Sequence, residues 1–262
     1  MSAVIGPWLA ALGVIASVAF VAWIVSLVRR DVGIVDGLWS LFFLAAGLTT
    51  WWYVDAGSAR PALVLALLAI WALRLSAHIF VRNHGQPEDY RYREMRERNA
   101  PFEWKSLYLV FGLQAALAWL IALPLIVAIA SPTGALGWLD GLAVLLWLTG
   151  FVFEAGGDWQ LAQFRRDPDN RGKVMASGLW RYTRHPNYFG DFCIWWAYYL
   201  FAVAAGGWWT IVSPLLMSVL LLKVSGVALL EKSIGDRRPG YADYVATTNA
   251  FFPGPSRPKG AA

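Results

Sequence analysis

Residues 4–28 read VIGPWLAALGVIASVAFVAWIVSLV, a run without a charged side chain that ends at Arg29 and Arg30. An α-helix needs about 20 apolar residues to cross a hydrocarbon layer about 30 Å thick. The run therefore predicts a transmembrane helix. No positively charged segment precedes it and no small-residue cleavage signal follows it, so we expect an anchor and not a cleaved signal peptide.

Further apolar stretches predict an all-α bundle of seven transmembrane helices, in one membrane domain over residues 1–262. Two uncharged runs are too long for a single crossing, and turn residues divide them at 131–134 and 206–207. The expected spans are 4–28, 37–54, 61–81, 106–130, 137–161, 188–205 and 208–230.

The composition agrees with a membrane protein. Hydrophobic residues make up 58% of the 262 residues and charged residues 15%, whereas soluble domains have roughly 45–50% and about 25%. These proportions exclude a soluble domain and a disordered chain. One cysteine excludes an internal disulfide and a multi-cysteine metal site, and three histidines argue against a histidine-rich metal cluster.

Positive charge predicts the orientation. Segments 29–36, 82–105, 162–187 and 231–262 hold 19 of the 22 Lys and Arg residues. Seven spans place these segments on one side, so the positive-inside rule predicts an outer N-terminus and a cytoplasmic C-terminus. The net charge of +5 is then topological, and we expect no nucleic-acid partner. The protein should be a multi-pass protein of a bacterial inner membrane.

Polar side chains inside or at the ends of these spans are functional candidates, because each charge costs about 2.5–3.5 kcal/mol there. Glu154, Asp158 and Arg165 share one helix face, and Asn187 and Asp191 lie four residues apart. The remaining candidates are Asp36, Arg74 and Lys223. We expect one polar pocket at the cytoplasmic end. The alternative is mutual neutralisation, with Lys and Arg extending to the interface.

The loop 163–187 is basic, aromatic and rich in turn residues, which suits a phosphate-bearing ligand. Arg184 and His185 come directly before Pro186, which can begin a helix whose N-terminus attracts anions. The alternative is an ordinary positive-inside loop. A second polar segment, 88–98, predicts a solvated amphipathic stretch at the membrane surface.

One motif, GLWRYTRHPNYFGD at 178–191, resembles the steroid 5α-reductase family, and most closely its bacterial 3-oxo-5α-steroid 4-dehydrogenase-like membrane proteins. The resemblance continues in VDGLW at 35–39, in Glu88-Asp89-x-Arg91-Tyr92, in Glu154-x-x-x-Asp158-x-Gln160-x-x-x-Phe164-Arg165, in LLEKS at 229–233 and in RPGYADY at 238–244. Arg-His-Pro-x-Tyr also occurs in sterol reductases and in isoprenylcysteine and phospholipid methyltransferases.

The resemblance implies a seven-helix bundle that binds NADPH and reduces a Δ4-3-oxo steroid or a sterol-like lipid taken from the bilayer. It also implies which residues contact the cofactor. The expected cofactor-binding residues, with the two that precede Pro186, are Arg74, Glu154, Asp158, Arg165, Lys173, Arg184, His185, Asn187, Tyr188, Asp191 and Lys223. We expect no partner besides the substrate and membrane lipids. We also expect the protein to be a monomer.

Reduction of an enone needs an acid at the carbonyl oxygen, where negative charge develops. Asp36 and Glu231 are the candidate catalytic residues, since one of two adjacent carboxyls would keep a proton at neutral pH. The alternative is that Asp36 caps its helix and Glu231 pairs with Lys232 or Arg237. Tyr188 or Tyr241 would then be the better acid.

Two other functions stay open at this point. One is a membrane methyltransferase that uses S-adenosylmethionine; it has no 2′-phosphate to bind, so the cations of the 163–187 loop count against it. The other is a lipid-binding or transport protein without enzymatic activity. The position of the polar residues at one end of the spans counts against this function.

Overall fold

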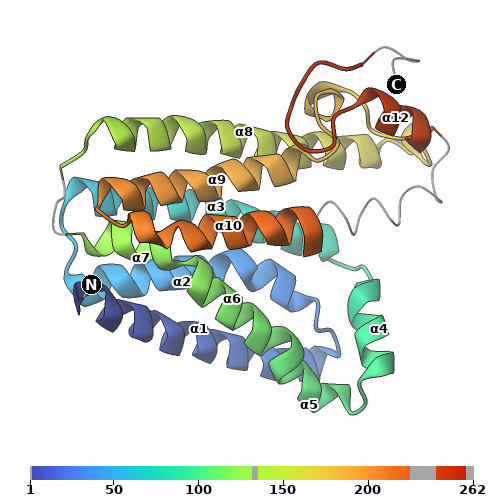
Figure 1. Cartoon of the computed structure of the whole chain (residues 1–262). Helices are drawn as coiled ribbons and strands as arrows, with labels where there is room; N and C mark the ends of the chain where they lie inside the picture. The colour runs from blue at the N-terminus through green and yellow to red at the C-terminus, as the bar shows by residue number, and fades with distance from the viewer. Residues whose placement is uncertain (1, 132–134, 225–239, 258–262) are drawn as a thin grey trace. The chain divides into compact units, whose positions relative to one another are not determined.

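The computed structural model describes residues 2–131, 135–224 and 240–257, and over these residues it is helical without strands (Figure 1). The chain divides into two compact units. Unit 1 holds Met1–Asp140 and Phe201–Ser213, and unit 2 holds Gly141–Leu200 and Pro214–Ala262.

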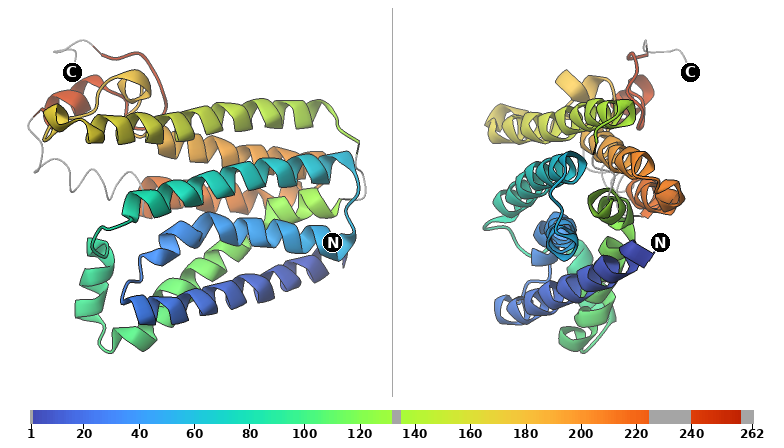
Figure 2. Two further views of the ribbon diagram at one scale, coloured as in Figure 1. Left: turned by 180° about the vertical axis from the view of Figure 1, so that it is seen from behind. Right: turned by 90° about the vertical axis from the view of Figure 1, so that its left-hand side faces the viewer.

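Unit 1 is built around α2 (Ile34–Val54), which contacts α1 (Ser2–Arg29) and α3 (Ala59–Asn83) along its length (Figure 2). Phe42 and Phe43 of α2 and Leu68 and Trp71 of α3 are fully buried. A Cβ atom at Gly47 would lie 2.6 Å from Leu68 Cδ2, so glycine permits the close approach of α2 and α3.

The expected fourth span is divided into consecutive short helical segments. It consists of α5 (Phe102–Ser106), the π-helix η1 (Leu107–Gly112), α6 (Leu113–Ile121) and α7 (Leu123–Ala130). The continuous helix expected over 106–130 is therefore divided at Ala122, because Pro124 has no N–H to donate to the preceding turn. A short surface helix, α4 (Tyr90–Arg98), connects α3 to the first of these segments, α5.

Unit 2 contains most of α8 (Trp138–Arg166) and of α9 (Pro186–Ala204). The loop between them has two short 3-10 turns, η2 (Pro168–Asn170) and η3 (Gly178–Arg181). After α9 follow η4 (Trp208–Ile211), α10 (Val212–Val219), the π-helix η5 (Leu220–Val224) and, close to the C-terminus, α12 (Tyr241–Thr247).

Among the described residues, five helical segments are long and apolar enough to cross a membrane: Ala3–Arg29, Ile34–Val54, Ala59–Asn83, Phe102–Ile121 and Trp138–Arg166. They confirm the prediction of a multi-pass membrane protein. The sixth and seventh expected spans correspond to α9 and to Trp208–Val224, whose last expected residues, 225–230, lie outside the described part. Seven crossings, the orientation of the termini and a single domain stay predictions.

A buried ion pair joins the first turns of α3 and α8. Arg60 Nε donates to Asp140 Oδ1 at 2.8 Å and Arg60 Nη2 to Asp140 Oδ2 at 3.0 Å. The Gly137 N–H donates to the same carboxylate at 2.7 Å, and both charged side chains are almost fully buried. Arg60 is the cation that the charge pattern predicts on the outer side, and Asp140 neutralises its charge.

We predict that Arg60→Met destabilises the protein, because it leaves the Asp140 carboxylate buried without its guanidinium partner. Breaking one side of a buried pair costs about 3–5 kcal/mol, and the midpoint of thermal unfolding in detergent should fall accordingly. The control is Arg60→Met combined with Asp140→Leu, which removes both charges and should recover most of the loss. A double variant as unstable as the single one would contradict this explanation.

Candidate functional site

Three glycines let α8 and α9 touch backbone to backbone in unit 2 (Figure 1). A Cβ at Gly150 would lie 2.5 Å from the carbonyl oxygen of Gly190, and a Cβ at Gly190 would collide with the backbone nitrogen of Glu154. A Cβ at Gly157 would lie 3.3 Å from the backbone nitrogen of Asn187. Small residues allow this approach where helices pack in a membrane.

This contact brings together polar residues that the sequence places in two different helices. Asn187 Nδ2 donates to Asp158 Oδ1 at 3.2 Å. Glu154 is 2% exposed and Asp158 is 7% exposed. Asp191 follows Asn187 by one turn of α9. The structure therefore gathers two buried carboxyl groups and an amide at the contact of α8 with α9.

The start of α9 agrees with the expectation of a helix that begins at Pro186. His185, directly before it, is buried, and its ring stacks on Tyr188 with the ring centres 5.8 Å apart. Arg184 Nη1 donates to the carbonyl oxygens of Thr248 at 2.9 Å and Val245 at 3.2 Å. Arg184 thus holds the end of α12 in place.

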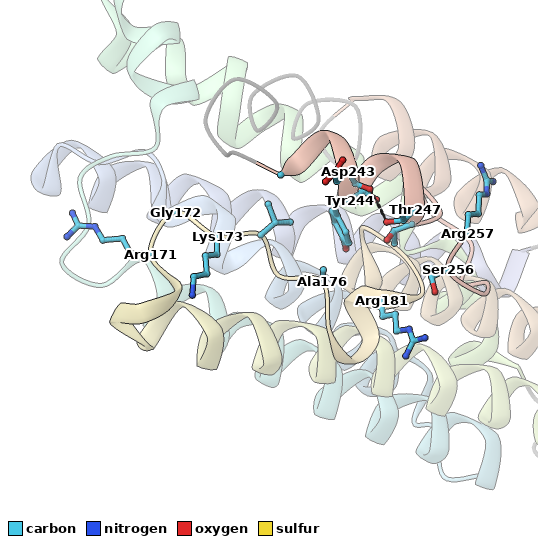
Figure 3. Close-up of a pocket in the computed structure, with 13 residues that line it drawn as sticks. Arg171, Gly172, Lys173, Ala176, Arg181, Asp243, Tyr244, Thr247, Ser256 and Arg257 are labelled. Carbon is cyan, nitrogen blue, oxygen red and sulfur yellow. Dashed lines mark hydrogen bonds between the residues drawn. The ribbon is translucent and has the colours of Figure 1, made fainter. Parts of the chain in front are cut away.

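The other expected cofactor residues are placed differently. Arg165 and Lys173 are exposed, on the end of α8 and on the following loop, and Lys173 lines a hollow of about 790 Å³ (Figure 3). Arg74 is half-buried in α3, and Lys223 is exposed in η5. Glu231 lies outside the described residues, so its predicted role has no structural counterpart here.

Asp36 lies in a polar cluster of unit 1. Tyr92 Oη donates to Asp36 Oδ1 at 2.5 Å, and Arg91 Nη2 donates to Asp36 Oδ2 at 2.8 Å. Gln114 Nε2 reaches Tyr92 Oη at 3.4 Å. Asp36 makes no capping bond at the start of α2, so the alternative that it caps its own helix is wrong. Two donors on one carboxyl group are the arrangement of an ionised Asp36.

Electrostatics keep the cluster in this state. Burial raises the pKa of the Tyr92 phenol, and the negative charge of Asp36 raises it further. Burial alone would lower the pKa of Arg91, but its bond to Asp89 and the charge of Asp36 outweigh this and raise it. Tyr92 therefore keeps its proton and Arg91 its charge throughout the neutral pH range.

Sequence reasoning placed Tyr92 within the resemblance but gave it no role, because the segment 88–98 predicts a solvated surface stretch. Most of α4 is exposed, but Tyr92 is 4% exposed. Glu88 anchors the segment by accepting from the Val32 N–H and from Arg96 Nη2, each at 2.9 Å. The sequence signal that could have given it a role is an aromatic residue three positions after Asp89 in a helix made mostly of charged residues.

We predict that Gly190→Ala disrupts this site, because its methyl group meets backbone atoms of Glu154 and Gly150 that cannot rotate away. Overpacking of this kind costs about 1–3 kcal/mol, and the thermal midpoint should fall. Gly141→Ala, on the neighbouring helix α8, is the control: its Cβ would have no neighbour within 4 Å. Equal midpoints for the two variants would show that α8 and α9 do not depend on this contact.

Comparisons with known proteins find one family and one curated relative. A family model described as "Protein of unknown function (DUF1295)" matches residues 22–248. An uncharacterized protein of Schizosaccharomyces pombe is 28% identical over 267 residues, which cover 89% of this chain and 76% of the relative. No solved structure gives a significant match.

Proposed function

Since the chain belongs to the DUF1295 family, within the steroid 5α-reductase-like superfamily, we propose that it is an NADPH-dependent membrane reductase. Its substrate would be a 3-oxo-steroid with a Δ4 double bond, or a similar enone lipid drawn from the bilayer. The observation that carries the proposal is the pair of buried carboxyl residues Glu154 and Asp158, with the half-buried Asn187 bonded to Asp158, at the contact of α8 and α9.

These residues fit a nucleotide. Carboxylates accept hydrogen bonds from ribose hydroxyls, and the Asn187 amide can both donate and accept. Arg165, in the last turn of α8, and Lys173, on the following loop, carry positive charges that suit phosphate groups. His185 and Tyr188 provide aromatic rings at the start of α9. When bound, NADPH would supply a hydride; the protein holds the nucleotide and keeps water from the reacting atoms.

We assign the proton-donating role to Tyr92 and a positioning role to Asp36. Hydride addition to the β-carbon of an enone leaves negative charge on the carbonyl oxygen, and a phenol directed at that oxygen stabilises it. Tyr92 has one proton, so it can donate to the substrate only by releasing Asp36. Arg91 then remains as the partner of Asp36 at 2.8 Å. This assignment replaces a protonated Asp36 as the acid.

We predict that NADPH raises the thermal midpoint of the purified protein more than NADH or S-adenosylmethionine does. Asn187→Ala and Asp191→Ala should weaken NADPH binding by about 10- to 150-fold, since a hydrogen bond with a charged group is worth roughly 1.5–3 kcal/mol. Asn99→Ala, which removes the same amide from the exposed end of α4, is the control. Stabilisation by S-adenosylmethionine alone would overturn the reductase proposal in favour of a methyltransferase.

A second prediction concerns turnover of a Δ4-3-oxo steroid. Tyr92→Phe should lower kcat by about 10²-fold or more, with NADPH affinity within about twofold of the parent. Tyr90→Phe, on the same helix but exposed, should leave kcat unchanged.

The pH dependence of kcat distinguishes a positioning role of Asp36 from a purely structural role. Because the pKa of Tyr92 is raised, kcat of the parent should not fall as the pH rises to the ordinary tyrosine value of about 10. Asp36→Asn removes a charge that raises this pKa, so the alkaline fall in kcat should move to lower pH. Normal turnover by Tyr92→Phe would exclude Tyr92 as the acid.

A further inference from the structure

The hollow of about 790 Å³ in unit 2 is formed by three segments that are distant in sequence (Figure 3). They are the loop 171–181, the helix α12 and the C-terminal tail at 256–257. Small-molecule pockets in proteins have volumes of roughly 300–1,000 Å³, so the hollow is large enough for a ligand of that class.

Hydrogen bonds hold these walls in place. Tyr244 Oη donates to the carbonyl oxygen of Trp180 at 2.6 Å, which fixes α12 to the loop. The tail is tied back at two points: the Gly254 N–H donates to the carbonyl oxygen of Tyr182 at 3.1 Å, and the Arg257 N–H to that of Thr247 at 2.8 Å. The walls are therefore assembled by the protein's own contacts, and a ligand need not order them.

The lining is strongly basic. It contains four cations, Arg171, Lys173, Arg181 and Arg257, against the single carboxylate of Asp243. Figure 3 shows Arg171 and Lys173 at one end and Arg181 and Arg257 at the other. Within the described part of the chain, the side chains of Arg171 and Arg181 form no hydrogen bond or ion pair. Their guanidinium donors are available to a ligand.

Guanidinium groups bind phosphate through paired N–H donors. Two exposed aromatic side chains, Tyr182 and Phe252, flank the point where the tail joins the loop. Tyrosine is enriched where a membrane meets water, the depth at which lipid headgroups lie.

We propose that this basic hollow binds a phosphate-bearing ligand, either the headgroup of an anionic phospholipid or the phosphate end of a nucleotide. Binding is measured without turnover. The possibility that the ligand is a phospholipid headgroup therefore does not depend on the reductase proposal. The nucleotide version rests on that proposal and would place the phosphates of NADPH here.

The test uses the full-length protein in detergent and two anionic probes, dioctanoyl phosphatidylglycerol and adenosine 2′,5′-bisphosphate. Zwitterionic dioctanoyl phosphatidylcholine is the negative control probe. The double variant Arg181→Gln with Arg257→Gln should weaken binding of one anionic probe by about tenfold or more, because two charge-assisted hydrogen bonds are removed. Arg181→Lys with Arg257→Lys keeps the charge and should retain part of the affinity.

The matched control is Arg93→Gln with Arg166→Gln, which removes two exposed cations outside the hollow. Loss confined to the hollow variant supports the proposal, and the probe that loses affinity identifies the source of the phosphate. Equal loss in both double variants, or no binding of either anionic probe, overturns it. If the parent binds a probe in this way but oxidises no NADPH with an enone, only the reductase proposal fails.

Discussion

A charge inside an apolar environment must find a partner on another segment, and this requirement organises the structure. Arg60 meets Asp140, Arg91 meets Asp36, and Asn187 meets Asp158. Of these, Arg60 and Asp140 form an almost fully buried ion pair, and leaving one member of such a pair alone costs several kcal/mol; Arg91 and Asp36 are partly exposed, and the Asn187 amide is uncharged. Each pair therefore selects which helical segments lie together, although apolar helices by themselves could pack in many ways.

The second constraint is steric. Lipid is as apolar as leucine, so hydrophobic burial does little to draw helices together in a membrane, and close packing has to do so. The contact of Gly150 with Gly190 brings the α8 and α9 backbones together, and the polar residues one turn away follow. The same glycines that make the helices pack thus concentrate buried carboxyl groups in one place. This is the environment in which a bound nucleotide can be held by few but strong hydrogen bonds.

The two polar clusters differ in character. In unit 1, Asp36 accepts hydrogen bonds from Tyr92 and Arg91, and in the proposed reduction the Tyr92 phenol would be the group that changes partner. In unit 2, the loop and tail that follow the Asp158–Asn187 pair carry an excess of cations around an open hollow. An enclosed phenol suits proton donation, and an open basic hollow suits a ligand that arrives with negative charge.

The sequence by itself determined the membrane class, most helix boundaries and the start of α9 at Pro186, and it supplied Asp158 and Asn187 as candidate site residues. These features depend on local composition and on spacing along one helix, which a linear pattern contains. Only the tertiary structure decided that Tyr92 is buried against Asp36, that Arg184 holds α12, and that Arg257 shares a hollow with Arg181. The physical reason is that each of these contacts joins segments tens of residues apart. Packing and the need to pair buried charges decide which residues contact one another across these segments. The local spacing of residues in the sequence contains neither kind of information.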